Sequence, residues 1–322
     1  MQMEIDVIEQ RIQDISPDLM KILLSDKTTK GFIRWGSDNY VNLGAEYQTD
    51  QEMKPDLVTG NHTSVIQPRV SKAEEEKNRR TRDKAEVFTP SWICNEQNNL
   101  IDAAWFGRED VFNRSSDKAW ETIPDPVKFP RDKIWKDYVD ARRMEISCGE
   151  APYLVSRYDT VSGEMIPIKD RIGLLDRKLR IVNENAQDDT EWLKWTIRAF
   201  QSCYGYDFQG DNVLLARENL LYTFWEYLED RLNRGPTLQE LKKVANIISW
   251  NIWQMNGLTM TAPYSLSPPA YTQISLFDLF DIEENNGNGK EEQKSCSDEI
   301  PCKIYDWRAN RSIEFRSLIK EG

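Results

Sequence analysis

The sequence predicts an α/β fold, and two segments of the chain carry this prediction. The segment 143–148, RMEISC, alternates apolar and polar residues as a short strand does, and Gly149 follows it directly. A second segment, CYGYD, ends at Asp207 and leads into a helical pattern over 211–232. In open α/β sheets ligands bind at the carboxyl ends of the strands, so this glycine and this acid are the first candidates for a site.

The strand at 143–148 is expected to turn Met144, Ile146 and Cys148 to one apolar face, because residues two apart share a face. Upstream of it, Pro90 is placed to open an amphipathic helix, with apolar residues such as Ile93, Leu100 and Ile101 behind it.

A capping box marks the start of a later helix. Thr237 is followed three residues on by Glu240, and such a pair satisfies free backbone groups at a helix start. The pattern behind it predicts a helix that runs to Gly257 as its C-cap. Near the end of the chain, CKIYDWR reads as one more strand, with Asp306 at its end.

These elements divide the chain into successive regions. The acidic, Gly- and Asn-rich stretch among them has the composition of a disordered linker. The regions are a mixed N-terminal part with a charged linker (1–84), a core (85–280) with a helical insertion (151–195), the acidic linker (281–301) and a C-terminal strand segment (302–322).

Composition excludes several classes of protein. The chain has 322 residues, a net charge of −12 and a single histidine, His62. Ser-His-Asp triads and multi-histidine metal sites are therefore nearly excluded. Its five cysteines are scattered and form no CxxC pair, and we find neither a signal peptide nor an apolar run near the roughly 20 residues of a membrane helix. We expect a reduced, cytoplasmic protein.

Three segments, taken together and in this order, resemble the motifs of a known family. AEVFTPSWIC is similar to the motif that opens N6-adenine DNA methyltransferases of restriction–modification systems. MEISCGEAPYL resembles their first cofactor motif, and GYDFQGDNVLLARENLL resembles their ribose-binding acid with its following helix. The resemblance to the group known as restriction endonuclease subunit M covers nearly the whole chain, and it implies a Rossmann-like methyltransferase fold that binds S-adenosylmethionine.

The resemblance assigns two parts of the chain to the methionine end of the cofactor. Phe88, Thr89 and Pro90 would line this end, as the FTP-type turn of the family does. Glu145 stands where the first-motif acid would bind, directly or through water, near the methionine amino group.

The resemblance also implies residues for the nucleoside end. Cys148 and Gly149 would form the tight turn beneath the cofactor, and Asp207 would hold the ribose hydroxyls. Phe208 would pack on the adenine ring, and Asp306 would match the third-strand acid that contacts the adenine amino group.

A basic cluster in the charged linker is the candidate contact to double-stranded DNA. Arg79, Arg80, Arg82 and Lys84 could touch phosphates, although such a run is more often a solvated helix or linker. The net negative charge predicts weak DNA binding by this chain alone.

The chain departs from the family pattern at the first cofactor motif. Ala151 stands where the family has a second glycine. If this position needs positive φ, alanine costs roughly 1 kcal/mol or more relative to glycine. Asp207 also lies 58 residues after Gly149, which is a long spacing and indicates an added subdomain or loop.

A larger departure is the missing catalytic loop. The family uses an Asn-Pro-Pro-Tyr-type loop to hold an extruded adenine, and this chain has no such tetrapeptide. TAPY (Thr261–Tyr264) and SPPAY (Ser267–Tyr271) are near misses. We therefore expect the chain to be the cofactor-binding portion or subunit of an adenine methyltransferase, whose partner or missing part supplies catalysis.

Three other functions stay open. The first is a non-catalytic scaffold or interaction subunit of a restriction or phage-defence complex. The second is a magnesium-dependent nuclease, because Asp50, Glu52 and Lys54 loosely match an acid followed by Glu-x-Lys. The third is a small-molecule methyltransferase, against which the FTP-type turn argues.

Overall fold

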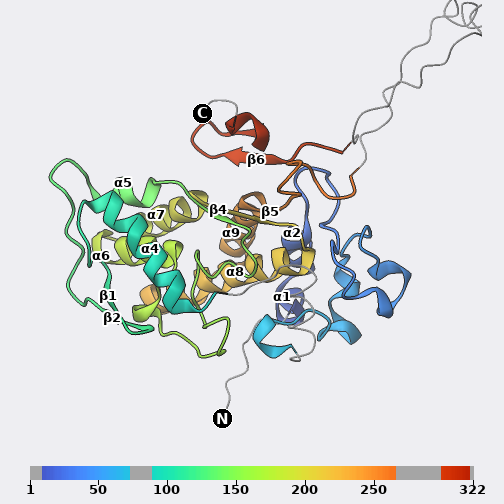
Figure 1. The fold of residues 1–322 in the computed structure, drawn as a ribbon, viewed down its shortest axis with the longest axis horizontal. Helices are drawn as coiled ribbons and strands as arrows, with labels where there is room; N and C mark the ends of the chain where they lie inside the picture. Colours follow the sequence, from blue (N-terminus) through green and yellow to red (C-terminus); the bar gives the residue numbers. More distant parts are fainter. Residues whose placement is uncertain (1–8, 73–88, 266–298, 320–322) are drawn as a thin grey trace, which may run out of the picture.

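The computed structural model describes residues 9–72, 89–265 and 299–319, and within these ranges the architecture is mixed α/β (Figure 1). A three-stranded parallel sheet runs through it in the order β3 (Arg143–Ile146), β4 (Cys203–Asp207) and β5 (Ile252–Gln254). The α/β prediction is confirmed at this level, as are the two strands expected from the sequence.

Helices from distant parts of the chain pack around this sheet. α8 and α9 contact both β4 and β5, and α7 contacts β4. The helices of this part are α4 (Ser91–Phe106), α5 (Trp135–Asp140), α6 (Leu174–Asn185), α7 (Asp189–Gln201), α8 (Gly210–Leu232) and α9 (Leu238–Asn251). The predicted helices after Pro90 and over 211–232 are confirmed.

The remaining described elements are short. Two helices, α1 (Glu9–Ile15) and α2 (Pro17–Leu24), open the described chain, and α2 packs against α9. Two antiparallel hairpins lie outside the parallel sheet: β1 (Asn113–Ser116) with β2 (Ala119–Thr122), and β6 (Lys303–Asp306) with β7 (Arg311–Glu314). None of the helices in the described ranges is both long and apolar enough to cross a membrane.

The start of α9 confirms the capping box, but its end differs from the prediction. Thr237 Oγ1 accepts a hydrogen bond from the Glu240 backbone N–H at 3.3 Å, and Glu240 accepts one from the Thr237 N–H at 2.7 Å. The helix ends at Asn251 instead of Gly257, because the next three residues pair with β4 as β5. The Asn251 side-chain amide holds the end of the helix beside the start of β4 by donating to the carbonyls of Phe200 and Cys203, at 2.9 Å each.

The two faces of the parallel sheet belong to two separate hydrophobic clusters. Cys203 and Ile252 pack into the large cluster that the helices share. Tyr204 and Trp253 point the other way, into a smaller cluster that includes Ile304 of β6. The predicted C-terminal strand is therefore confirmed as a strand, but it covers one face of the sheet with its hairpin instead of extending the sheet.

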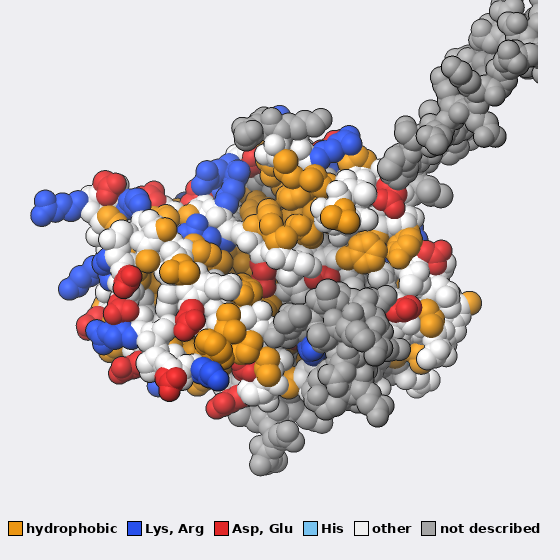
Figure 2. Space-filling view, viewed as in Figure 1, with side chains coloured by type: hydrophobic (Ala, Val, Ile, Leu, Met, Phe, Trp, Pro, Cys, Tyr) orange, Lys and Arg blue, Asp and Glu red, His pale blue; other side chains and the backbone are white. Residues whose placement is uncertain are grey.

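Strand β3 is the edge of the sheet and turns its apolar residues outward. Met144 is 37% exposed and Ile146 is 66% exposed, whereas Glu145 between them is only 6% exposed. The expected alternation is present, but the apolar side of this strand points outward, because the inward position is occupied by a carboxylate that binds backbone N–H groups. Figure 2 shows hydrophobic side chains gathered beneath the C-terminal hairpin that Figure 1 marks with β6.

The buried face of α4 is polar, contrary to the expected amphipathic pattern. Leu100 is 71% exposed and Ile101 is 40% exposed, while Asn95 and Asp102 are buried. The reason is Arg177 of α6, which is fully enclosed beside α4. Its guanidinium forms an ion pair with Asp102 at 2.5 Å and donates to Asn95 Oδ1 at 2.8 Å.

Two buried carboxylates, Glu9 of α1 and Glu218 of α8, accept no hydrogen bond in the described structure. Burial raises the pKa of Glu9 to about 8, and burial together with the nearby Glu9 raises the pKa of Glu218. A carboxyl group whose pKa is raised by folding favours the native state at low pH. That contribution is lost as the pH rises from the ordinary value of 4.5 toward about 8.

Glu9→Gln is therefore expected to stabilise the chain increasingly as the pH rises above 4.5. At pH 9 the amide stays neutral where the acid would ionise, and we expect a gain in the free energy of unfolding of about 1 kcal/mol or more. At pH 4 the two proteins should unfold nearly alike, because the acid is then largely protonated in both the folded and the unfolded chain. Urea unfolding at both pH values measures this, with exposed Glu96→Gln as control. An equal effect at both pH values would contradict the buried-acid explanation.

Candidate functional site at the carboxyl ends of the strands

Asp207, at the carboxyl end of β4, joins the ends of two strands. Its Oδ2 accepts hydrogen bonds from Ser147 Oγ at 2.8 Å and from the Gly149 N–H at 2.9 Å. Its Oδ1 accepts one from the Gln209 N–H at 2.9 Å. Burial raises the pKa of Asp207, and these three donors act against that rise by stabilising the charged form. The carboxylate thus holds the turn after β3 beside the end of β4.

The turn after β3 contains two residues with positive φ, and one of them is Ala151, where the sequence analysis named positive φ as the condition for strain. Gly149 has φ of 51° and Ala151 has φ of 66°, so both positions lie in the left-handed region. Cys148 anchors the turn, with its N–H donating to the Tyr206 carbonyl at 2.8 Å. Ala151 is fully buried and its N–H donates to the Cys148 carbonyl at 2.7 Å. Alanine is thus strained at the position where the family has glycine.

Ala151→Gly is expected to leave the protein as stable or to raise its free energy of unfolding by up to about 1 kcal/mol, because glycine adopts this φ freely. The matched control is Ala262→Gly, at a buried alanine outside the positive-φ positions. There the same substitution should destabilise by roughly 0.5–1 kcal/mol. Urea unfolding compares the two, and equal losses in both variants would show that Ala151 is not strained.

Glu145 connects β3 to the segment that follows the turn. Its Oε1 accepts from the Tyr153 N–H at 3.3 Å and its Oε2 from the Leu154 N–H at 3.2 Å. Burial raises the pKa of Glu145 well above its ordinary value, and the two N–H donors oppose this rise. Glu145 and Asp207 are close enough for the charge on Asp207 to raise the pKa of Glu145 further.

The Thr89–Pro90 turn lies beside this same segment. The Thr89 carbonyl accepts hydrogen bonds from Thr160 Oγ1 at 3.1 Å and from Cys94 Sγ at 3.6 Å. The Tyr153 side chain lies close to Thr89. Pro90 caps α4, whose first N–H, on Ser91, donates to Asp159 at 2.7 Å. Through Tyr153, the turn at Thr89 and the acid Glu145 belong to one connected group of residues.

Phe208 follows Asp207 directly, and its backbone packs closely against Gln254 and Gly36. Its carbonyl accepts a hydrogen bond from Gln254 Nε2 at 2.8 Å. Gly36 approaches so closely that a Cβ there would stand 2.5 Å from the Phe208 carbonyl oxygen. The Phe208 ring contacts the ring of Tyr264, with the centroids 6.1 Å apart.

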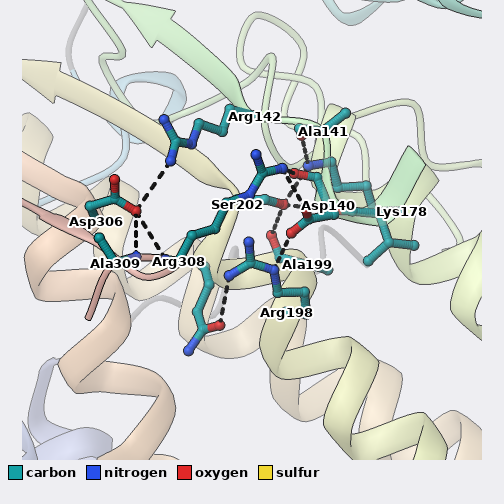
Figure 3. Close-up of polar contacts among 12 residues, drawn as sticks. Asp140, Ala141, Arg142, Lys178, Arg198, Ala199, Ser202, Asp306, Arg308 and Ala309 are labelled. Atoms are coloured by element: carbon teal, nitrogen blue, oxygen red, sulfur yellow. Dashed lines mark hydrogen bonds and ion pairs between the residues drawn. The ribbon is translucent and has the colours of Figure 1, made fainter. Parts of the chain in front are cut away.

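Asp306 lies at the opposite end of the sheet. Its Oδ1 accepts hydrogen bonds from Arg142, just before β3, at 3.2 Å, and from the Arg308 and Ala309 N–H groups at 2.9 and 3.1 Å (Figure 3). These N–H groups and Arg142 lower the pKa of Asp306. Asp140 forms a second connection between the hairpin and the core, because it pairs with Arg308 of the hairpin and with Arg198 of α7. Asp306 thus fastens the C-terminal hairpin to the core, and it is not brought to Asp207.

The structure therefore gathers most of the predicted cofactor residues at one edge of the sheet. These are Thr89, Pro90, Glu145, Cys148, Gly149, Asp207 and Phe208. Phe88, the basic residues Arg79, Arg80, Arg82 and Lys84, and the SPPAY segment all lie outside the described residues.

The residues of the nuclease alternative are not arranged in a strand. Lys54 caps a short 3₁₀ turn and pairs with Glu46 at 3.8 Å, and Glu52 forms only an isolated bridge with Arg34. In the described ranges we find no group of three or more His, Cys, Asp or Glu side chains placed to hold a metal ion.

Three residues of this edge were missed by the sequence analysis: Ser147, Gln254 and Gly36. Tyr264, the last residue of the TAPY near miss, was named there but was not expected beside Phe208. Ser147 stands between a predicted strand and Gly149, so its place beside the acid could have been inferred. Gln254 was hidden because its strand continues the helical pattern of α9. The contact of Gly36 with Phe208 joins distant parts of the chain and leaves no local signal.

Comparison with known proteins gives no relative for this chain. No protein-family model, no curated protein and no solved structure matches it.

Proposed function

We propose that this chain is the S-adenosylmethionine-binding portion or subunit of a DNA adenine-N6 methyltransferase, with a Rossmann-like methyltransferase fold. The observation that carries the proposal is that three sequence motifs with the family's order meet at one edge of a parallel sheet. There Glu145 accepts a hydrogen bond from the Tyr153 N–H and Asp207 accepts one from the Gly149 N–H, and the turn at Thr89 lies close to the Tyr153 side chain. Ligand binding at the carboxyl ends of parallel strands is the general rule for such sheets.

The donor and acceptor groups at this edge fit a nucleoside. An ionised carboxylate offers about four acceptor positions, and among the described residues Asp207 Oδ1 accepts one hydrogen bond, from the Gln209 N–H. An acceptor position is thus left for a ribose hydroxyl. Gly149 has no side chain, so the backbone of the turn can approach a ligand closely at this residue.

Each residue has a defined role in this proposal. S-adenosylmethionine, when bound, supplies an activated methyl group, so the protein mainly positions the reacting groups. Thr89 and Pro90 line the methionine end, and Glu145 stands near its amino group. Asp207 orients the ribose and Phe208 packs on the adenine ring.

The proposal includes a partner or a further segment for catalysis. The chain has no Asn-Pro-Pro-Tyr loop. Parallel sheets are normally covered on both faces, yet the edge strand β3 pairs only with β4 in the described structure and exposes Met144 and Ile146. This exposed apolar edge suits contact with a second subunit. Double-stranded DNA is the proposed substrate of the complex.

Ultraviolet crosslinking of methyl-labelled S-adenosylmethionine tests the proposal. We expect label in peptides that contain residues 145–154 and 204–210, and we expect unlabelled S-adenosylhomocysteine to compete. Label confined to other peptides, such as the hairpin at 303–314, would contradict it. The same preparation, mixed with DNA alone, should transfer no methyl group. Transfer by the isolated chain would refute the need for a partner and leave the cofactor site intact.

A further inference from the structure

The loop after β5 presents an aromatic ring beside Phe208. Tyr264 is 40% exposed, and its ring contacts the Phe208 ring at an interplanar angle of 64° and a centroid distance of 6.1 Å. Phe208 in turn is the residue that follows Asp207 at the end of β4. An exposed aromatic ring therefore stands beside Phe208, the residue that follows the acid of the candidate site.

This loop is held firmly at both of its ends. The Asn256 N–H donates to the Thr261 carbonyl at 2.9 Å, and the Ala262 N–H donates to the Ile300 carbonyl at 2.9 Å. Ser265 Oγ then accepts from the Ile300 N–H at 2.9 Å. The backbone on both sides of Tyr264 is thus fixed by hydrogen bonds.

The backbone at Tyr264 is strained. Its φ is 55°, in the left-handed region that bulky side chains rarely adopt. Strained residues persist only where the surrounding structure imposes them, and they cluster at binding sites. A small residue or glycine would satisfy the turn more easily, so packing of this half-exposed ring against the core does not explain why tyrosine stands here.

We propose that Tyr264 is a ligand-contacting residue, which forms with Phe208 an aromatic wall for the purine ring of the nucleoside held by Asp207. This inference rests on the proposed function. It assigns a cofactor contact to Tyr264, which the sequence marked only as the end of TAPY, a near miss to the catalytic loop. The residue comes from the loop after β5 and from neither of the two strand ends that carry the cofactor motifs. A ring that stacks needs only its aromatic face, so the hydroxyl of Tyr264 is dispensable.

Calorimetric titration with S-adenosylmethionine and with adenosine tests this role. Stacking on an aromatic side chain contributes enough that Tyr264→Ala should weaken both ligands roughly ten- to hundred-fold. Tyr264→Phe should bind as the unmodified chain does. Leu258→Ala is the matched control, because Leu258 lies in the same loop and is 94% exposed. It should leave both affinities unchanged, and thermal unfolding should show all three variants folded.

The outcomes separate this inference from the proposed function. If the unmodified chain binds S-adenosylmethionine and Tyr264→Ala binds it equally well, the aromatic wall is refuted and the cofactor site stands. If Tyr264→Phe loses affinity as Tyr264→Ala does, the hydroxyl acts and stacking is the wrong explanation. If the folded, unmodified chain binds neither ligand, the proposed function fails and this inference fails with it.

Discussion

Replacing Arg177 with methionine is expected to lower the free energy of unfolding by about 3–5 kcal/mol, because removing one partner of a buried ion pair leaves the other charge buried and unpaired. Arg177 and Asp102 are each only 1% exposed in their side chains and lie 2.5 Å apart. The same guanidinium donates to Asn95 and Asn99 at 2.8 Å each. The substitution therefore leaves several buried polar groups without this hydrogen-bond partner and removes the polar contacts of Arg177 between α4 and α6.

Urea unfolding measures this loss, and an exposed ion pair provides the control. Arg234 pairs with Glu240 at 2.7 Å, but its side chain is 43% exposed. Arg234→Met should cost less than about 1 kcal/mol, as exposed pairs do. Similar losses in the two variants would show that the buried network contributes no more than a surface pair.

Gly36→Ala is expected to have the second-largest effect. Gly36 has φ of 64°, and a Cβ there would stand 2.5 Å from the Phe208 carbonyl oxygen and 2.9 Å from Gln254 Nε2. The positive φ costs alanine roughly 1–2 kcal/mol, and relieving the clash by moving packed groups costs about 1–3 kcal/mol more. We therefore expect a total loss of about 2–5 kcal/mol in the free energy of unfolding.

Gly60→Ala separates the two contributions to this loss. Gly60 has nearly the same φ, 62°, but nothing lies within 4 Å of a Cβ placed there. This variant should show only the cost of the positive φ. If Gly36→Ala loses no more stability than Gly60→Ala, the close approach beneath Phe208 is not as tight as described.

The elements that the sequence predicted well are those with local signals. The capping box at Thr237, the turn at Gly149 and the acid at Asp207 depend on residue types within a few positions of each other. The strand at 143–146 was found for the same reason, but its orientation was not. Glu145 turns inward because two backbone N–H groups of a following segment need an acceptor, and no pattern within the strand records that need.

The features that the sequence missed depend on tertiary contacts. β5 continues the apolar pattern of α9, and only its pairing with β4 ends the helix at Asn251. The polar buried face of α4 requires Arg177 from a distant helix. Asp306 ends a strand, as expected, but its partner Arg142 precedes β3, so it fastens a hairpin at the far end of the sheet.

The most direct test of the proposed site is calorimetric titration of S-adenosylmethionine into three proteins: the unmodified chain, Asp207→Ala and Asp306→Ala. We predict micromolar binding by the unmodified chain, a loss of roughly ten- to hundred-fold in Asp207→Ala through a missing charge-assisted hydrogen bond, and no change in Asp306→Ala. No binding by the folded, unmodified chain, or a loss in Asp306→Ala with none in Asp207→Ala, would contradict a cofactor site at the carboxyl ends of β3 and β4.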